Sequence, residues 1–165
     1  MVLPARRALL TAAACLAAAP PTLLSSPGAA VAAGAAAGVA DSKLRNLPAD
    51  QLADIVARDI RANQFLVTGA LSRDIYAESC TFKDEIDTYT LDKWIKGTGA
   101  LFDGAKSHVN LVGAVHADER EVRFRFDEIL CFNLPLVKPK VPLTGTLILT
   151  RSPGDGLIER YEEIW

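Results

Sequence analysis

The chain has 165 residues and a formal net charge of −2, with 23% charged and 50% hydrophobic residues. It contains no run of Lys or Arg longer than two residues, so we expect no nucleic-acid partner. Its length accommodates one domain with a substantial core.

The first forty residues differ in composition from the rest. They contain sixteen alanines, no Asp or Glu, and only two charges, Arg6 and Arg7. A positive start, an apolar run over residues 8–19 and then small residues are typical of a cleavable targeting segment. The adjacent arginines favour twin-arginine export, and a generic signal or an alanine-rich organelle transit peptide is the alternative. We therefore expect residues 1–40 to be a targeting segment and residues 41–165 to be a single domain.

The next part of the chain has helical periodicity. Pro48 and Asp50 are typical of a helix start, and the apolar residues that follow recur at helical spacing as far as residue 67. Gly69 interrupts this pattern, and a short second helix is predicted over residues 70–75. A third helix is predicted over residues 91–102.

The remaining elements have the composition of β-strands. One strand is predicted over residues 76–84, and everything after residue 107 is rich in Val, Ile, Phe, Leu and Thr. Four long strands are expected there, over residues 108–116, 120–132, 143–150 and 157–165. The proline-containing stretch 135–142 must bend or lie at a sheet edge. Helices first and a long antiparallel meander last predict an α+β domain with its helices on one face of the sheet.

Several stretches of the chain resemble one known superfamily. They are "QFLVTGALSRDIYAESCTFKD" (64–84), "LFD" (101–103), "LPLVKPKVPLTGTLIL" (134–149) and "GLIERYEEIW" (156–165). In their order along the chain and in their amino-acid sequence, these stretches are similar to a plant and algal chloroplast branch of the nuclear transport factor 2-like (SnoaL-like) superfamily. Glu85 and Thr90 depart from that branch, which usually has proline and glycine there.

The resemblance implies a cone-shaped fold, with N-terminal helices packed on a curved antiparallel sheet around an internal pocket. It also implies a chloroplast protein of the thylakoid lumen, with the stroma or bacterial-type export as alternatives. In the implied strand order, two strands separate Cys80 from Cys131, so we expect no disulfide between them. We expect no metal site, no cofactor and no membrane span after residue 40; a homodimer through the sheet is compatible with the fold.

Three carboxylates are candidate catalytic residues. In the strand over residues 120–132, Glu128 shares one face with phenylalanines, where burial would raise its pKa; pairing with Arg or Lys at a pocket mouth is the alternative. Asp84 ends the first predicted strand and either acts in acid–base chemistry or caps the following turn. Glu163 alternates with Tyr161 and Trp165, and either lines the pocket or pairs with an arginine across the sheet.

Two classes of function follow. The first is a non-catalytic module that binds a small apolar ligand or a protein partner in an apolar pocket, lined by Phe124, Phe126, Leu130 and Trp94. The alternative is a small lyase or isomerase of dehydratase or cyclase type. In that reading Glu128 or Asp84 is the base and a neighbouring carboxylic acid such as Glu163 donates a hydrogen bond. The sequence favours binding.

Overall fold

A computed structural model describes residues 42–165 of the chain. The expected targeting segment, residues 1–40, lies outside the described residues. The elements in order are α2 (Ala49–Arg58), the π-turn η1 (Asp59–Asn63), α3 (Phe65–Thr68), the 3-10 turn η2 (Arg73–Ile75), β1 (Tyr76–Lys83), β2 (Thr88–Thr90), α4 (Leu91–Leu101), β3 (His108–Ala117), β4 (Glu121–Cys131), β5 (Lys140–Arg151) and β6 (Ile158–Ile164).

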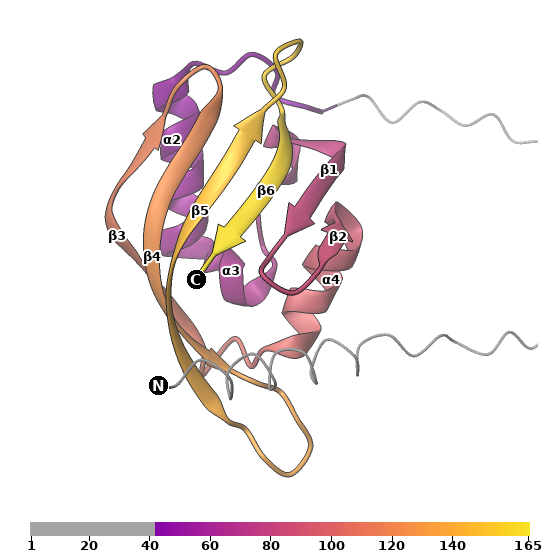
Figure 1. Ribbon diagram of the computed structural model, residues 1–165, viewed down its shortest axis with the longest axis vertical. Helices are drawn as coiled ribbons and strands as arrows, with labels where there is room; N and C mark the ends of the chain where they lie inside the picture. Colours follow the sequence, from indigo (N-terminus) through magenta and orange to yellow (C-terminus); the bar gives the residue numbers. More distant parts are fainter. Residues whose placement is uncertain (1–41) are drawn as a thin grey trace, which may run out of the picture.

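Six strands form one curved sheet in the order β2-β1-β6-β5-β4-β3. The four long strands β3 to β6 are antiparallel, as predicted. β1 instead pairs in parallel with β6, so the sheet is mixed. Figure 1 shows α2 and α3 behind the sheet and α4 beside β1 and β2. This is the predicted α+β cone, with the helices on the concave face.

The first helix ends earlier than the periodicity predicted. Leu52 and Val56 are buried one turn apart in α2, but the helix loosens into η1 and stops at Gln64, which has φ 54°. The Gln64 amide donates to the carbonyl of Val109 at 3.0 Å and accepts from the Val109 N–H at 2.8 Å. Gln64 thus supplies β3 with the backbone partners that its open edge lacks, and this contact accounts for the break.

Two further predictions need correction. The helix expected over residues 70–75 is only the 3-10 turn Arg73–Ile75, and β2 (Thr88–Thr90) was not predicted at all. β5 begins at Lys140 and includes Pro142. Pro142 is tolerated because β6 pairs with β5 only from Thr146 onward, so the prolyl nitrogen needs no ladder partner.

The two cysteines of the described residues are free and buried, as predicted. Cys80 lies on β1 and Cys131 on β4, and β6 and β5 separate these strands. Among residues 42–165 no helix has the length and apolar character needed to cross a membrane.

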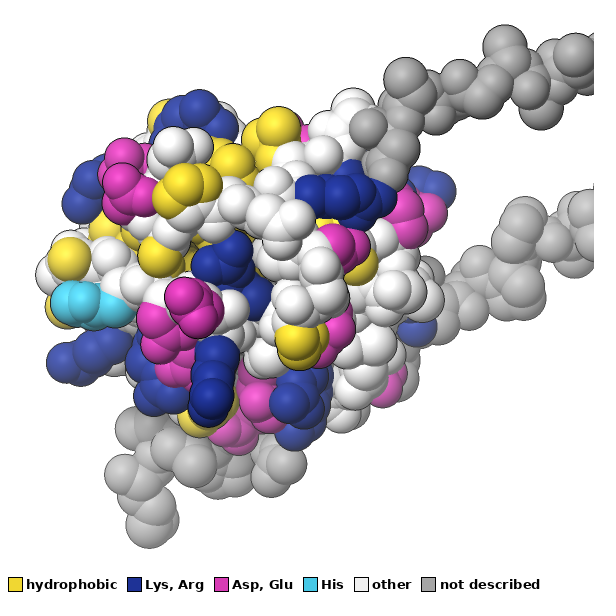
Figure 2. Space-filling view, turned by 90° about the horizontal axis from the view of Figure 1, so that it is seen from above, with side chains coloured by type: hydrophobic (Ala, Val, Ile, Leu, Met, Phe, Trp, Pro, Cys, Tyr) yellow, Lys and Arg dark blue, Asp and Glu magenta, His cyan; other side chains and the backbone are white. Residues whose placement is uncertain are grey.

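Charged side chains of both signs mix on the end of the molecule that carries the β5–β6 turn. Figure 2 shows Lys and Arg side chains interspersed there with Asp and Glu. The Arg45–Asp155 pair, at 2.9 Å, belongs to this pattern.

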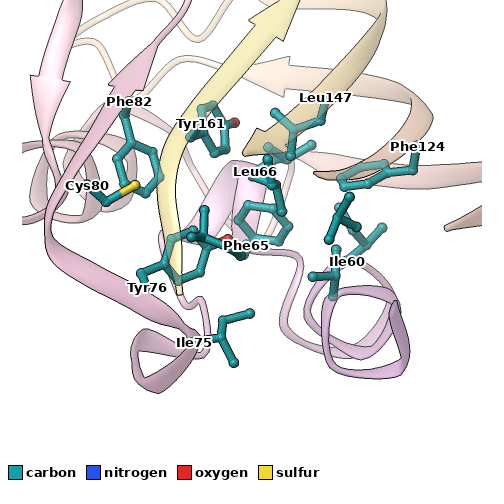
Figure 3. Close-up of a cluster of buried hydrophobic side chains, with 14 of the residues drawn as sticks. Ile60, Phe65, Leu66, Ile75, Tyr76, Cys80, Phe82, Phe124, Leu147 and Tyr161 are labelled. Carbon is teal, nitrogen blue, oxygen red and sulfur yellow. The ribbon is translucent and has the colours of Figure 1, made fainter. Parts of the chain in front are cut away.

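Most of the core lies between the sheet and the helices. Phe82 on β1 stacks on Tyr161 of β6 at 4.6 Å between ring centroids and on Trp94 of α4 at 4.8 Å. Ile60 and Phe65 come from the helical side of this cluster (Figure 3). Each fully buried apolar side chain of this kind contributes about 1.5–3 kcal/mol.

Gly145 is a position where the packing forbids a side chain. A Cβ there would lie 2.6 Å from Cζ of Phe126 and 2.8 Å from the carbonyl oxygen of Ile164. We predict that Gly145→Ala lowers the free energy of unfolding by about 1–3 kcal/mol, because the core must shift to admit a methyl group. Urea unfolding followed by tryptophan fluorescence measures this.

Gly97 in α4 is the matched control. Nothing in the described part of the chain, beyond its own helix and neighbours, lies within 4 Å of a Cβ at this position. Gly97→Ala should therefore raise the free energy of unfolding, by up to about 1 kcal/mol. Equal effects of the two substitutions would contradict this account of Gly145.

Candidate functional site

The inner face of β4 is apolar except at one position. Its side chains are buried at every second residue, and Glu128, at 4% exposure, is the charged member of the row. Phe124 and Phe126 belong to the larger core cluster, whereas Leu130 belongs to a second, smaller one. Glu128 therefore lies where the two apolar clusters meet, and its inward orientation agrees with the predicted alternation.

Glu128 has no partner for its charge. Within residues 42–165 no side chain or backbone N–H donates a hydrogen bond to its carboxyl group, and no Lys or Arg pairs with it. Its carboxyl oxygens are not fully enclosed, because no fully buried side-chain oxygen of the described residues lacks a hydrogen-bond partner. The alternative prediction, pairing with a basic residue at a pocket mouth, is wrong. A buried carboxyl in this setting is far easier to keep neutral than charged.

Glu163 is held in the opposite way. The Tyr161 hydroxyl donates to its Oε2 atom at 2.6 Å, and the Trp165 indole N–H donates to its Oε1 atom at 2.6 Å. All three residues lie on the inner face of the C-terminal strand and its end, two residues apart. The arginine partner considered for Glu163 is absent among the described residues, and its place is taken by these two aromatic donors.

Asp84 follows β1 and caps a turn. Its Oδ1 atom accepts from the backbone N–H groups of Ile86 and Asp87, both at 2.8 Å, which confirms the capping prediction. The parallel register pairs Phe82 with Tyr161 and Lys83 with Glu162. One residue further along, Asp84 lies beside Glu163. Asp84 therefore both caps the turn and lies close to Glu163.

The three carboxylates form one layer across the inner face of the sheet. Glu128 is paired with Leu143 of β5, and Glu163 is paired with Leu147. Gly145 lies between these two leucines on the same face of β5. We call Asp84, Glu163 and Glu128 the acid layer. Sequence alternation indicated each member separately, and the sheet brings them together.

The acid layer shifts its own pKa values. Burial raises the pKa of Glu128 well above its ordinary value, and the charge of Glu163 raises it further. Burial raises the pKa of Glu163 to about 6, although the hydrogen bonds from Tyr161 and Trp165 lower it, and the charge of Asp84 adds to the rise. Burial also raises the pKa of Asp84 against the effect of its two backbone donors.

Half-buried apolar side chains lie next to the acid layer. Five of them pack against the smaller cluster: Ile86, Leu101, Phe102, Leu134 and Trp165. The predicted ligand contacts Phe124, Phe126, Leu130 and Trp94 are all buried in the two clusters, and their contact with a ligand stays a prediction. Tyr161 and Trp165 were not predicted as site residues, although their alternation with Glu163 was the signal that could have found them.

The described residues contain no group of three His, Cys, Asp or Glu side chains placed to hold a metal ion. His108 and His116 are exposed, and the ring of His108 contacts the Asn110 amide oxygen at 2.7 Å. The arrangement therefore offers carboxyl groups, a phenol and an indole for chemistry, with apolar walls beside them.

Comparison with solved structures assigns the fold. A candidate SnoaL-like polyketide cyclase from Jannaschia sp. CCS1 superposes with a TM-score of 0.54 at 14% identity, covering 74% of this chain and 90% of that one. A nuclear transport factor 2-like protein from Burkholderia thailandensis gives 0.53 at 15% identity, covering 72% and 91%. The epoxide hydrolase/cyclase-like enzyme SalBIII, of salinomycin pyran-ring formation, gives 0.52 at 15% identity, covering 70% and 91%.

These likenesses establish a nuclear transport factor 2-like fold for residues 42–165. No protein-family model and no curated protein matches the chain. The neighbours include enzymes and proteins of unassigned role, so the fold by itself is compatible with a ligand-binding domain and with a small isomerase or cyclase.

The acid layer predicts an unusual pH dependence of stability. Because the pKa of Glu128 is raised in the folded state, its contribution is fully present below its unfolded pKa, near 4.5, and is lost as pH rises toward the folded pKa. Glu128→Gln stays neutral at every pH. The stability of this variant relative to the parent should therefore rise with pH above 4.5, by about 1.4 kcal/mol per pH unit until the folded pKa is reached.

Urea unfolding of both proteins between about pH 4 and pH 8 measures this difference. Carboxylates with lowered pKa values, such as Glu78, titrate equally in both proteins and cancel. Parallel stability curves for the parent and the variant would contradict the prediction.

Proposed function

We propose that this domain binds a small, largely apolar molecule at the acid layer and moves a proton within it, as an isomerase, lyase or cyclase. One observation carries the proposal: Glu128 is a buried carboxyl with no hydrogen-bond or charge partner among the described residues, beside a second carboxyl that has two donors. Placing an unpartnered carboxyl in the core costs stability, and such groups concentrate at functional sites.

The two environments assign different roles to the two carboxyls. Glu163 accepts hydrogen bonds from Tyr161 and Trp165, which favour its charged form, and its pKa of about 6 suits a general base near neutral pH. Glu128 has no donor to stabilise a charge, so it keeps its proton and serves as the acid. This differs from the roles expected from sequence, where Glu128 or Asp84 was the base and Glu163 the hydrogen-bond donor.

The proposed step needs no further group. The Glu163 carboxylate removes a proton from a carbon next to a carbonyl group of the ligand, and negative charge develops on the carbonyl oxygen. The neutral Glu128 carboxyl donates a hydrogen bond to that oxygen and stabilises it. In a β,γ-unsaturated ligand the charge is shared with the γ carbon, and return of the proton from Glu163 to that carbon moves the double bond into conjugation and completes an isomerisation. Asp84 supports the base, because its charge raises the pKa of Glu163.

A cyclase-like reaction is also consistent with what the neighbours are named for. The Jannaschia protein is described as a SnoaL-like polyketide cyclase and SalBIII acts in pyran-ring formation. At 14% and 15% identity these likenesses show the fold, and the class of reaction rests on the geometry of the acid layer.

Ligand binding without chemistry is the second candidate, and the half-buried apolar set beside the acid layer favours it. Ile86, Phe102, Leu134 and Trp165 offer apolar contact area whatever the carboxyls do. The two candidates differ in one measurable property, which is proton exchange on a bound ligand.

The test uses apolar ketones as probes, with hydrogen–deuterium exchange next to the carbonyl followed by NMR in D2O. We predict that the protein accelerates exchange of at least one probe and that Glu163→Gln lowers the rate at least about a hundredfold, because the base is lost. The rate should rise through about pH 6, where Glu163 ionises. 2-Naphthol, a stable mimic of an enolate, should bind to the parent and the variant.

Glu162→Gln is the matched control. Glu162 is the neighbour of Glu163 in the chain and pairs with Lys83 at 2.9 Å on the other face of the sheet. This substitution should leave exchange unchanged. If naphthol binds but no probe exchanges, the domain is a binding module and the enzyme proposal is rejected. If Glu162→Gln loses exchange as Glu163→Gln does, the assignment of Glu163 as the base is rejected.

We further propose that the chain belongs to the plant and algal chloroplast branch and acts in the plastid, with the thylakoid lumen as the first expectation. The acid-free residues 1–40 and the stretch 156–165 support this. N-terminal sequencing of the protein from fractionated plastids should find a start between residues 33 and 41. Recovery of an intact Met1 would contradict processing.

A further inference from the structure

The connection between β4 and β5 presents two apolar side chains to solvent. Leu136 is 105% exposed and Val137 is 63% exposed, the highest values among the large hydrophobic residues that the structure describes. Figure 1 shows this connection projecting as a loop beyond the ends of the other strands. We call residues 135–140 the hairpin tip.

The backbone of the hairpin tip holds Leu136 in this position. Leu136 has φ 74°, in the left-handed region, and the Val137 N–H donates to the Pro135 carbonyl at 2.9 Å. A hydrogen bond across one residue with positive φ defines the rarer and more strained form of the γ-turn. A leucine pays a steric cost there that glycine would avoid. The strained backbone therefore holds toward solvent a side chain that makes no packing contact of its own.

The hairpin tip is also basic, although the chain as a whole is negative. Residues 133–142 contain Lys138 and Lys140 and no acidic residue. Asp103 beside the tip contacts Lys138 at 2.8 Å and Lys106 at 3.7 Å. Two lysines thus contact one aspartate at this end, and Lys140 adds a third positive charge to the tip, in contrast to the mixed charges of the end seen in Figure 2.

We propose that the hairpin tip docks on the surface of an anionic membrane, with Leu136 and Val137 entering the lipid interface and the lysines facing the headgroups. Exposed aliphatic side chains flanked by Lys are the combination that favours an anionic lipid surface. Pro135 and Pro139 restrict the loop, so little conformational freedom is lost on docking.

A lipid surface fits the tip better than a folded protein does. The two side chains stand on a projecting loop, and the long flexible lysines beside them suit a fluid layer of negative headgroups. A protein partner would require a matching cavity for Leu136. The membrane assignment is independent of the acid layer, so the two proposals can fail separately.

Vesicle co-sedimentation of the full-length chain tests this proposal. The probes are phosphatidylcholine vesicles with and without phosphatidylserine. The parent should bind the anionic vesicles more tightly than the neutral ones, and Leu136→Ser/Val137→Ser should lower that binding at least about tenfold. Lys138→Gln/Lys140→Gln should lower binding about tenfold on anionic vesicles only. Added salt should likewise weaken binding of the parent to anionic vesicles.

Ile129→Ser/Ile164→Ser is the matched control, because Ile129 and Ile164 are exposed aliphatic residues, 44% and 46%, on the outer face of the sheet. This variant should bind vesicles like the parent. Residues 1–40 are common to all the proteins, so their own affinity for lipid cancels. Equal binding by the parent and the Leu136/Val137 variant overturns the proposal, as does absence of parent binding or equal parent binding to both kinds of vesicle.

Discussion

The parallel pairing of β1 with β6 is the contact on which the site depends. It joins the first strand of the domain to the last, and it places Phe82 on Tyr161 so that Trp94 can complete the aromatic stack. The same register carries Asp84 to the side of Glu163. A slip of one residue would turn every side chain of β1 to the other face, and both the core and the acid layer would be lost together.

The acid layer lowers the stability of the fold, because it places a carboxyl group where an apolar side chain would pack. Glu128 interrupts an otherwise apolar row, and Tyr161 is buried with its hydroxyl committed to Glu163. An apolar residue at position 128 would join the two core clusters into one. The domain instead keeps a proton-binding group there, and its pKa makes the folded state more stable when that group is neutral.

Strand alternation was enough to predict that Glu128 faces inward. Successive side chains of a strand point to opposite faces, and Glu128 is an even number of residues from the buried phenylalanines. Alternation could not show that no Lys or Arg pairs with Glu128. That depends on which residues of the other strands share the inner face of the sheet. The break at Gln64 escaped prediction for a similar reason: its cause is a contact with Val109, forty-five residues further along. Periodicity describes one element, whereas these features arise between elements.

The acid layer and the hairpin tip meet through Leu134. This residue packs against the smaller cluster beside the carboxyls, and it lies two residues from the exposed Leu136 at the start of the same connection. A tip held at a lipid surface would place the apolar side of the site close to the hydrocarbon layer. Apolar ligands concentrate in that layer rather than in water. A domain that draws its ligand from the membrane would need no large opening toward solvent, and the burial of the acid layer maintains the raised pKa values on which the proposed proton transfer depends.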